Sequence, residues 1–292
     1  MTLTPVDILR VGNELGEGIS WRARDQTLWW TDIQSSRLYR YTLATGNLQS
    51  FPTPERVGSF GFVSDSEQLI TAFASGIALF DPKSNSVGWR ARPEEVAAGV
   101  RFNDGRVDRQ GRFWAGTMVE DGKPPARGCL YSLGSTGEAR NHIQGVKISN
   151  GLCFSPDGTR LYFTDSPTRL ICVYQLVEPE GILVGRQHFA EVPEGASPDG
   201  ATVDVDGCVW SAHWGSGCVV RYTPDGRVDR VIELPTRQPS CVCFAGPDLD
   251  ILCVTTARVD LNDSVLHAEP HAGDVFLYRV GTQGLTEPEY RA

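Results

Sequence analysis

The sequence has no run of about 20 apolar residues, so no segment is long enough to cross a bilayer as a helix. Its first residues lack both the basic and the apolar stretch of a secretory signal. Basic residues form no cluster, and acidic residues outnumber them 36 to 27, which disfavours nucleic acid and anionic membranes as partners. We therefore expect a cytoplasmic protein that binds neither membranes nor nucleic acid.

Motifs that use cysteine or serine for chemistry are also missing. The eight cysteines include no CxxC pair and mostly lie in apolar, strand-like runs. This pattern indicates buried free thiols in a reducing compartment, and it disfavours cysteine as a metal ligand. The sequence contains no Gly-x-Ser-x-Gly motif, so a serine nucleophile has no support.

Helical periodicity is absent, and a strand-like repeat is present in its place. A short apolar or aromatic pair recurs at intervals of about 40 to 48 residues, flanked by alternating segments and tight turns of the Asp-Gly type. The six pairs are Trp29-Trp30, Leu69-Ile70, Phe113-Trp114, Leu161-Tyr162, Val209-Trp210 and Ile251-Leu252. Each unit is typical of an antiparallel meander, because Asp-Gly between alternating residues is a strong hairpin signal.

Six meanders of this length predict an all-β fold, a six-bladed β-propeller with four-stranded antiparallel blades. We expect residues 1–292 to form this single domain. The ring should close by pairing of residues 5–11 with the C-terminal unit near residues 274–280. A monomer is expected, because propeller blades leave only short, protected strand edges.

One position of the repeat carries polar residues in most units. It lies 11 to 13 residues before the second member of each apolar pair and holds Glu17, Ser59, Asn103, Asn150, Asp199 and Cys241. Equivalent positions fall where the chain enters each innermost strand, so these side chains should meet at one end of the central channel. Asn-Gly and Asp-Gly are also ordinary turn dipeptides, but their registration across blades favours a shared site over isolated turns.

Glu17, Asn150 and Asp199 together offer two carboxylates and one amide oxygen. Such hard ligands favour Ca²⁺, Mg²⁺ or Mn²⁺, and they also accept Zn²⁺ or Fe²⁺. Three protein ligands leave coordination positions for water and substrate, which is typical of a catalytic site. The sequence therefore predicts one divalent metal ion at this end of the channel.

Four segments resemble the motifs of the regucalcin (senescence marker protein) and gluconolactonase family, in the family's order and over nearly the whole chain. They are LGEGISW at 15–21, RFNDGRVD at 101–108, ISNGLCFSPDG at 148–158 and SPDGATVD at 197–204. The resemblance implies a six-bladed propeller that uses one divalent metal to open sugar lactones. It makes Glu17, Asn150 and Asp199 the metal ligands. Ile19 stands where the family commonly has proline, which affects only the local backbone.

The resemblance also assigns the substrate contacts. Arg101 and Asn103 would bind substrate hydroxyls and the carbonyl, and Glu120 would add a further contact. The predicted reaction is metal-dependent hydrolysis of an aldonolactone, such as glucono-, galactono-, arabinono- or xylonolactone, in carbohydrate catabolism. Asp199 is the candidate general base for the attacking water, and the metal would polarise the lactone carbonyl.

Two other functions stay open on the sequence. A calcium-dependent esterase or phosphotriesterase on the same fold would use the same metal site, and a non-catalytic calcium-binding propeller would need no turnover. An apolar pocket would favour the esterase. Arg101, Asn103 and Glu120 favour a polyhydroxylated substrate instead.

The remaining polar candidates have simpler interpretations. His213 is close enough in sequence to Trp210 to reach the channel mouth, but a packed or hydrogen-bonded histidine is the expected outcome. His267 and His271 lie in a loop-like stretch around a proline, where no helical i, i+4 ligand pair forms. The segment 204–207 resembles half a calcium loop, yet it lacks the distal glutamate and sits at a hairpin, so we expect a turn.

Overall fold

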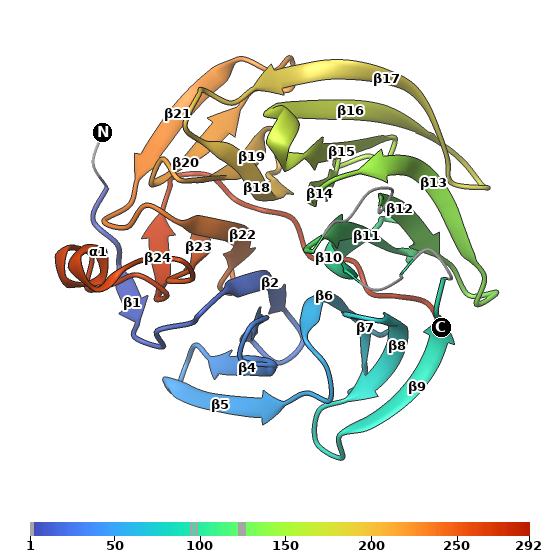
Figure 1. Cartoon of the computed structure of the whole chain (residues 1–292), viewed down its shortest axis with the longest axis horizontal. Helices are drawn as coiled ribbons and strands as arrows, with labels where there is room; N and C mark the ends of the chain where they lie inside the picture. The colour runs from blue at the N-terminus through green and yellow to red at the C-terminus, as the bar shows by residue number, and fades with distance from the viewer. Residues whose placement is uncertain (1–2, 94–95, 97–98, 122–126) are drawn as a thin grey trace.

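The structure, a computed structural model, describes residues 3–93, 96, 99–121 and 127–292. Six four-stranded antiparallel sheets stand in a ring around a central axis, as Figure 1 shows. The sheets follow one another around the ring in chain order. The fold is the six-bladed β-propeller that the repeat predicted.

Each of the first five blades is a simple meander of four consecutive strands. Blade 1 contains β2 (Gly16–Arg22), β3 (Thr27–Asp32), β4 (Arg37–Thr42) and β5 (Asn47–Pro52). Blade 2 contains β6 (Val57–Phe62), β7 (Leu69–Phe73), β8 (Gly76–Asp81) and β9 (Ser86–Ala91). Blade 3 contains β10 (Val100–Val107), β11 (Phe113–Val119), β12 (Gly128–Leu133) and β13 (Ala139–Val146).

Blades 4 and 5 repeat the same order of strands. Blade 4 contains β14 (Ser149–Phe154), β15 (Arg160–Asp165), β16 (Leu170–Val177) and β17 (Ile182–Glu191), with the 3₁₀ helix η1 (Ser166–Thr168) after β15. Blade 5 contains β18 (Ser197–Val203), β19 (Val209–Trp214), β20 (Cys218–Tyr222) and β21 (Val228–Glu233). Blade 6 contains β22 (Pro239–Ala245), β23 (Ile251–Thr256), β24 (Val275–Arg279) and β1 (Asp7–Leu9).

The recurrent apolar pair lies in the second strand of every blade and joins the blades to one another. Neighbouring residues of a strand point to opposite faces of its sheet. Trp30 accordingly packs in the core that blade 1 shares with blade 6, while Trp29 packs in the core shared with blade 2. Phe113 and Trp114 divide in the same way between the cores on the two sides of blade 3. The pair recurs because each blade must fill two cores.

The ring closes through the N-terminal strand. β1 pairs antiparallel with β24, with Asp7 opposite Leu277 and Leu9 opposite Val275. The sixth sheet therefore takes its outermost strand from the beginning of the chain, in the order β1-β24-β23-β22. The predicted closure is confirmed, although the strand β1 is shorter than the predicted segment 5–11.

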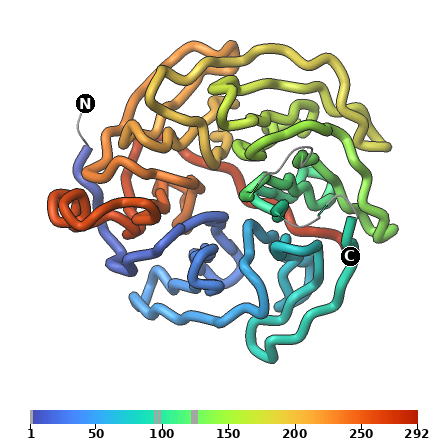
Figure 2. Tube along the Cα trace, in the orientation of Figure 1, coloured from blue at the N-terminus to red at the C-terminus, as the bar shows by residue number. Residues whose placement is uncertain are grey.

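A second closure comes from the C-terminal segment 281–292, which runs across the ring away from blade 6 (Figures 1 and 2). Its backbone bonds to blade 5 through Gln283 O, which accepts from Val205 N at 3.0 Å. Tyr290 is bonded to blade 2, donating to Phe62 O at 2.7 Å and accepting from Ser64 N at 3.0 Å. The tail thus ties together blades that are not neighbours in sequence.

The only α-helix among the described residues is α1 (Asp263–Ala268), between β23 and β24. Asn262 caps it by accepting a hydrogen bond from Val265 N at 3.1 Å. His267 lies in this helix, so the loop expected around it was wrong: six residues are too few to show helical periodicity in sequence. Within the described ranges, no helix is long and apolar enough to cross a membrane.

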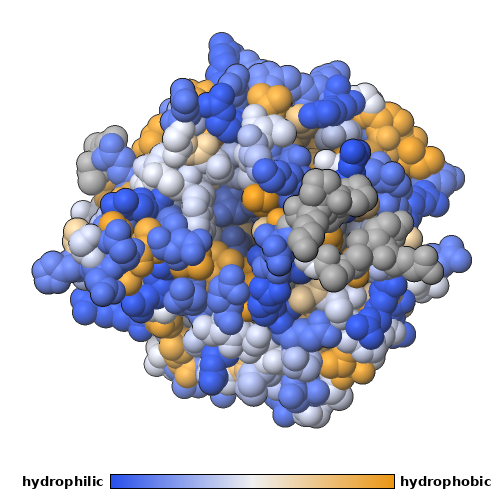
Figure 3. All heavy atoms as spheres, viewed as in Figure 1, coloured by the Kyte–Doolittle hydropathy of each residue, from blue (hydrophilic) through white to orange (hydrophobic). Residues whose placement is uncertain are grey.

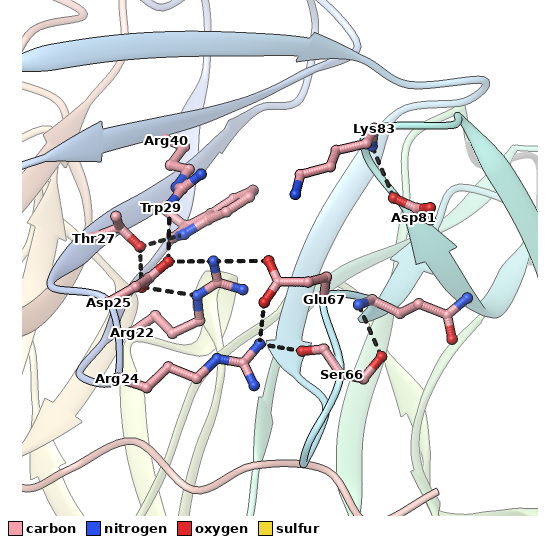
Figure 4. A network of polar contacts seen from close by, with 11 residues as sticks. Arg22, Arg24, Asp25, Thr27, Trp29, Arg40, Ser66, Glu67, Asp81 and Lys83 are labelled. Carbon is pink, nitrogen blue, oxygen red and sulfur yellow. Dashed lines mark hydrogen bonds and ion pairs between the residues drawn. The ribbon is translucent and has the colours of Figure 1, made fainter.

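Ion pairs also join blades 1 and 2 (Figure 4). The buried guanidinium of Arg22 lies over the Trp29 ring, 5.1 Å from its centroid, and pairs with Asp25. Glu67, from the first turn of blade 2, accepts from Arg22 at 3.4 Å and from Arg24 at 3.1 Å. This cluster stabilises the interface by combining a cation–π contact with charge pairing.

Candidate metal and substrate site

All six innermost strands are irregular at the level of the predicted site. Register shifts interrupt the pairing between Glu17 and Ser20, Val57 and Ser59, Phe102 and Gly105, Asn150 and Cys153, Pro198 and Ala201, and Pro239 and Val242. Bulges of this kind bend a strand and redirect its side chains. Gly18 and Gly151 have φ of 57° and 67°, which glycine adopts without strain. The glycines that follow Glu17 and Asn150 therefore allow the backbone to take the left-handed conformation that the irregular strands require at these positions.

The structure brings Glu17 and Asp199 together, although they belong to blades 1 and 5. Their carboxyl groups lie within hydrogen-bond reach of one another, and their residues are only 8% and 6% exposed. Burial, reinforced by the charge of Asp104, raises the pKa of Glu17 to about 8. Burial and the neighbouring charge of Glu17 raise the pKa of Asp199 well above its ordinary value. Two such carboxylates are both ionised only when a cation compensates them.

Asn150 is held on two sides. Its Oδ1 accepts from Asn103 Nδ2 at 2.9 Å, and its Nδ2 donates to Ser166 Oγ at 2.9 Å. The Ser166 hydroxyl in turn donates to the carbonyl of Pro198, the residue before Asp199, at 2.7 Å. Hydrogen bonds thus connect Asn150 to the strand that carries Asp199.

The proposed substrate residues form a second group beside the first. Arg101 donates through Nη1 to Asn103 Oδ1 at 2.7 Å and through Nε to Glu120 Oε1 at 2.8 Å. Arg56 donates to both oxygens of Glu120, each at 2.7 Å. Burial opposes the charge of Glu120, but the hydrogen bonds from Arg56 and Arg101 lower the pKa of its carboxyl group. Glu120 is therefore an ionised acceptor near neutral pH.

This donor set fits a divalent cation. No three His, Cys, Asp or Glu side chains of the described ranges converge, so an all-anionic site is not formed, and an amide oxygen is the natural third donor. Glu17 and Asp199 supply facing carboxylates whose raised pKa values report uncompensated charge. Oxygen donors of these types are the ones that hard cations prefer. Figure 3 shows a hollow near the centre of the ring on the face in view.

The other two members of the repeated position stay outside this group. Ser59 is buried, and its Oγ has no hydrogen-bond partner among the residues that the structure describes. Cys241 is a buried free thiol whose pKa is raised by burial and by the nearby charge of Glu17. Neither takes part in the hydrogen-bond network of Arg101, Asn103 and Asn150 as the structure has it.

An ion pair joins the innermost strand of blade 3 to the C-terminal segment. Arg106 Nη1 pairs with Glu287 of the C-terminal segment at 2.7 Å and also donates to Thr202 Oγ1 at 3.2 Å. Asp104 accepts from the backbone N–H groups of Gly105 and Leu152. The C-terminal segment is therefore bonded through Glu287 to the innermost strand of blade 3.

Sequence reasoning missed four residues of this network: Arg56, Asp104, Arg106 and Ser166. Asp104 and Arg106 lie in the segment 101–108, one and three residues after Asn103, which the repeated position had identified. That motif could therefore have revealed them. Arg56 and Ser166 lie outside every motif. Their roles depend on contacts with other strands, which leave no signal in the local sequence.

The simpler interpretations hold for His213 and for the segment 204–207. His213 is buried and its Nε2 lies 3.2 Å from the Tyr222 hydroxyl, so it is a packed, hydrogen-bonded histidine. Asp204 is also buried and accepts from the indole of Trp210 at 2.8 Å and from the N–H of Asp206 at 3.0 Å. The segment 204–207 is therefore a turn that anchors blade 5. His271 pairs with Asp274 at 2.9 Å.

Comparison with known proteins agrees with this geometry. Residues 15–258 match the family described as SMP-30/gluconolactonase/LRE-like region. The chain belongs to this family. Two members are similar over nearly their whole length: a 6-deoxy-6-sulfogluconolactonase of Pseudomonas putida (38% identity, 96% of each chain) and an L-arabinolactonase of Azospirillum brasilense (38% identity, 95% of this chain and 92% of the relative).

The family likeness extends to solved structures. A calcium-binding protein, regucalcin, from Agrobacterium tumefaciens superposes with a TM-score of 0.93 at 30% identity. The superposition covers 100% of this chain and 99% of the other. This member of the SMP-30/gluconolactonase family therefore shares its complete architecture with a protein that is named for calcium binding.

Proposed function

We propose that this protein hydrolyses sugar-acid lactones to the free aldonic acids, using one divalent cation held by Glu17, Asn150 and Asp199. The observation that carries this proposal is the meeting of two buried carboxylates from blades 1 and 5 beside a fixed amide from blade 4. The family and the two named lactonases among its members support an aldonolactone as the substrate class.

Arg101, Asn103 and Glu120 would bind the sugar part of the substrate. Their hydrogen bonds to one another fix the donors and the acceptor before any substrate arrives. An ionised Glu120 accepts hydrogen bonds from hydroxyl groups, and an arginine fork donates to several oxygens at once. This combination suits a polyhydroxylated lactone better than an apolar ester.

The bound cation would polarise the lactone carbonyl and offset the negative charge that develops on its oxygen. Asp199 would accept a proton from the attacking water. The water oxygen would bond to the carbonyl carbon, the ring C–O bond would then break, and the proton taken by Asp199 would pass to the departing alkoxide, giving the hydroxy acid and restoring the Asp199 carboxylate.

We further propose that the protein works as a monomer in the cytoplasm, in carbohydrate catabolism. All eight cysteines are free thiols, and seven of them are buried, which suits a reducing compartment. The six blades close on themselves through β1 and the C-terminal segment 281–292, so the ring itself leaves no open gap for a second copy.

A proton-release assay on a panel of aldonolactones tests the proposal. The protein is first treated with a chelator and then supplied with single divalent metals, and an aryl ester and a phosphotriester are included as competing substrate classes. We expect metal-restored hydrolysis of one or more sugar lactones, lost in Glu17→Gln and Asp199→Asn. Preferred turnover of the ester or phosphotriester, or no turnover by folded protein with any metal, would contradict it.

A further inference from the structure

Ser166 connects the two strands that carry the proposed metal ligands Asn150 and Asp199. It opens η1 directly after β15 and is only 5% exposed. Its Oγ accepts from Asn150 Nδ2 at 2.9 Å and donates to the carbonyl of Pro198 at 2.7 Å. One small side chain therefore bridges blades 4 and 5 beside the site.

The direction of these two hydrogen bonds is forced by chemistry. A serine hydroxyl has a single hydrogen, and the carbonyl of Pro198 is able only to accept it. With that hydrogen committed, the Ser166 oxygen must accept from Asn150. The amide of Asn150 therefore presents nitrogen to Ser166 and directs Oδ1 to the opposite side.

The other end of the chain of hydrogen bonds imposes the same orientation. Arg101 is able only to donate, so the atom of Asn103 that it contacts at 2.7 Å is the oxygen. Asn103 then donates through Nδ2 to Ser149 O at 3.0 Å and to Asn150 Oδ1 at 2.9 Å. Both amides are fixed from both ends, and neither is free to rotate by half a turn.

This orientation matters because an amide binds a cation through oxygen and not through nitrogen. We propose that Ser166 is a positioning residue of the metal site, which holds the oxygen of Asn150 toward the channel and ties it to the backbone preceding Asp199. The inference rests on the proposed function, since it takes Asn150 and Asp199 as ligands. Partners that orient metal ligands in this way typically change affinity by about 10- to 100-fold.

Metal affinity, measured without turnover, tests this role. Mn²⁺ binding to the chelator-treated full chain is followed by the electron paramagnetic resonance signal of free Mn²⁺. We expect Ser166→Ala to weaken binding by about 10- to 100-fold, because the alanine variant leaves Asn150 Nδ2 and the Pro198 carbonyl without their shared partner. Ser75→Ala is the matched control: its hydroxyl donates to Glu55 at 2.8 Å, away from these ligands, and we expect its affinity to equal that of wild type.

A double substitution separates positioning from general damage. If Ser166 acts through Asn150, adding Ser166→Ala to Asn150→Ala should cause little further loss of Mn²⁺ affinity. Wild-type affinity in Ser166→Ala, or an equally large loss in the Asn150→Ala background, would overturn the inference and leave the proposed function standing. Absence of Mn²⁺ binding by wild type, or full binding by Glu17→Gln, would overturn both.

Discussion

Arg56 binds Glu120 through two parallel hydrogen bonds of 2.7 Å, although the residues are 64 positions apart and enter the site from blades 2 and 3. Such a bidentate contact fixes both the position and the plane of a carboxylate. Arg101 reaches the same carboxylate at 2.8 Å. Glu120 is therefore held between two guanidinium groups before substrate binds.

Removal of Arg56 should weaken substrate binding more than it slows the chemical step. Arg56→Ala leaves Glu120 with one of its two guanidinium partners, so we expect the KM for the preferred lactone to rise roughly tenfold, equivalent to about 1.4 kcal/mol, at nearly unchanged kcat. Steady-state kinetics measures this. Arg24→Ala, which removes a pair with Glu67 at the interface of blades 1 and 2, serves as the control. An unchanged KM in Arg56→Ala would contradict the role of Arg56 in holding Glu120.

Two aspartates that share one arginine should differ sharply in their effect on stability. Arg221 lies 2.8 Å from both Asp204 and Asp206, whose side chains are 0% and 63% exposed. Asp204→Ala should lower the free energy of unfolding by about 3–5 kcal/mol, because it leaves the buried N–H groups of the Trp210 indole, the Cys208 backbone and Arg221 Nε without their acceptor. Asp206→Ala should cost about 1 kcal/mol or less. Urea denaturation measures both, and equal losses would be inconsistent with this assignment.

His213 should make the protein less stable as the pH falls below neutral. Burial lowers the pKa of His213 to about 4, whereas a histidine in the unfolded chain titrates near about 6.5. Between these values the unfolded chain binds a proton that the folded chain does not, so the free energy of unfolding decreases as the pH is lowered. The full effect is about 3 kcal/mol.

The comparison that isolates this effect is His213→Gln against wild type, in urea at neutral pH and near about pH 5. The variant should lose less stability than wild type between the two conditions. Any loss of the Tyr222 contact is the same at both values and cancels. Identical pH slopes for the two proteins would show that His213 does not titrate as its burial requires.

Binding of the cation should also be visible as heat stability. An ion present at about a hundred times its Kd adds about 2.7 kcal/mol to the folded state. We expect Ca²⁺ or Mn²⁺ to raise the Tm of chelator-treated wild type by several degrees and to leave the Tm of Glu17→Gln unchanged. Equal shifts in both proteins would place the ion elsewhere.

Much of the architecture could be predicted from sequence because its causes repeat. An apolar pair such as Trp29-Trp30 is required in each blade to fill two cores, so the number of pairs in the sequence predicts the number of blades. The same periodicity puts Glu17 and Asp199 at the same position of their repeats, and the structure places their carboxyl groups within hydrogen-bond reach. Repetition made these long-range relationships readable.

The remaining features have no repeating cause. The contact between Arg56 and Glu120 joins the residue before β6 to the residue after β11, so it depends on where these two strands begin and end. The position of Ser166 depends on η1, which only blade 4 has among the described residues. Helix α1 is set by the Asn262 cap and not by periodicity. Such contacts join single residues of different blades, and one sequence carries no signal that pairs them.

Anomalous diffraction from crystals of the wild-type protein grown with Mn²⁺ tests the central claim most directly. We predict one strong Mn²⁺ peak in the channel, with Glu17, Asn150 and Asp199 as its protein ligands and Asn150 bound through Oδ1. A peak held by other residues, or no peak in the channel under conditions where the metal restores lactone hydrolysis, would contradict the account.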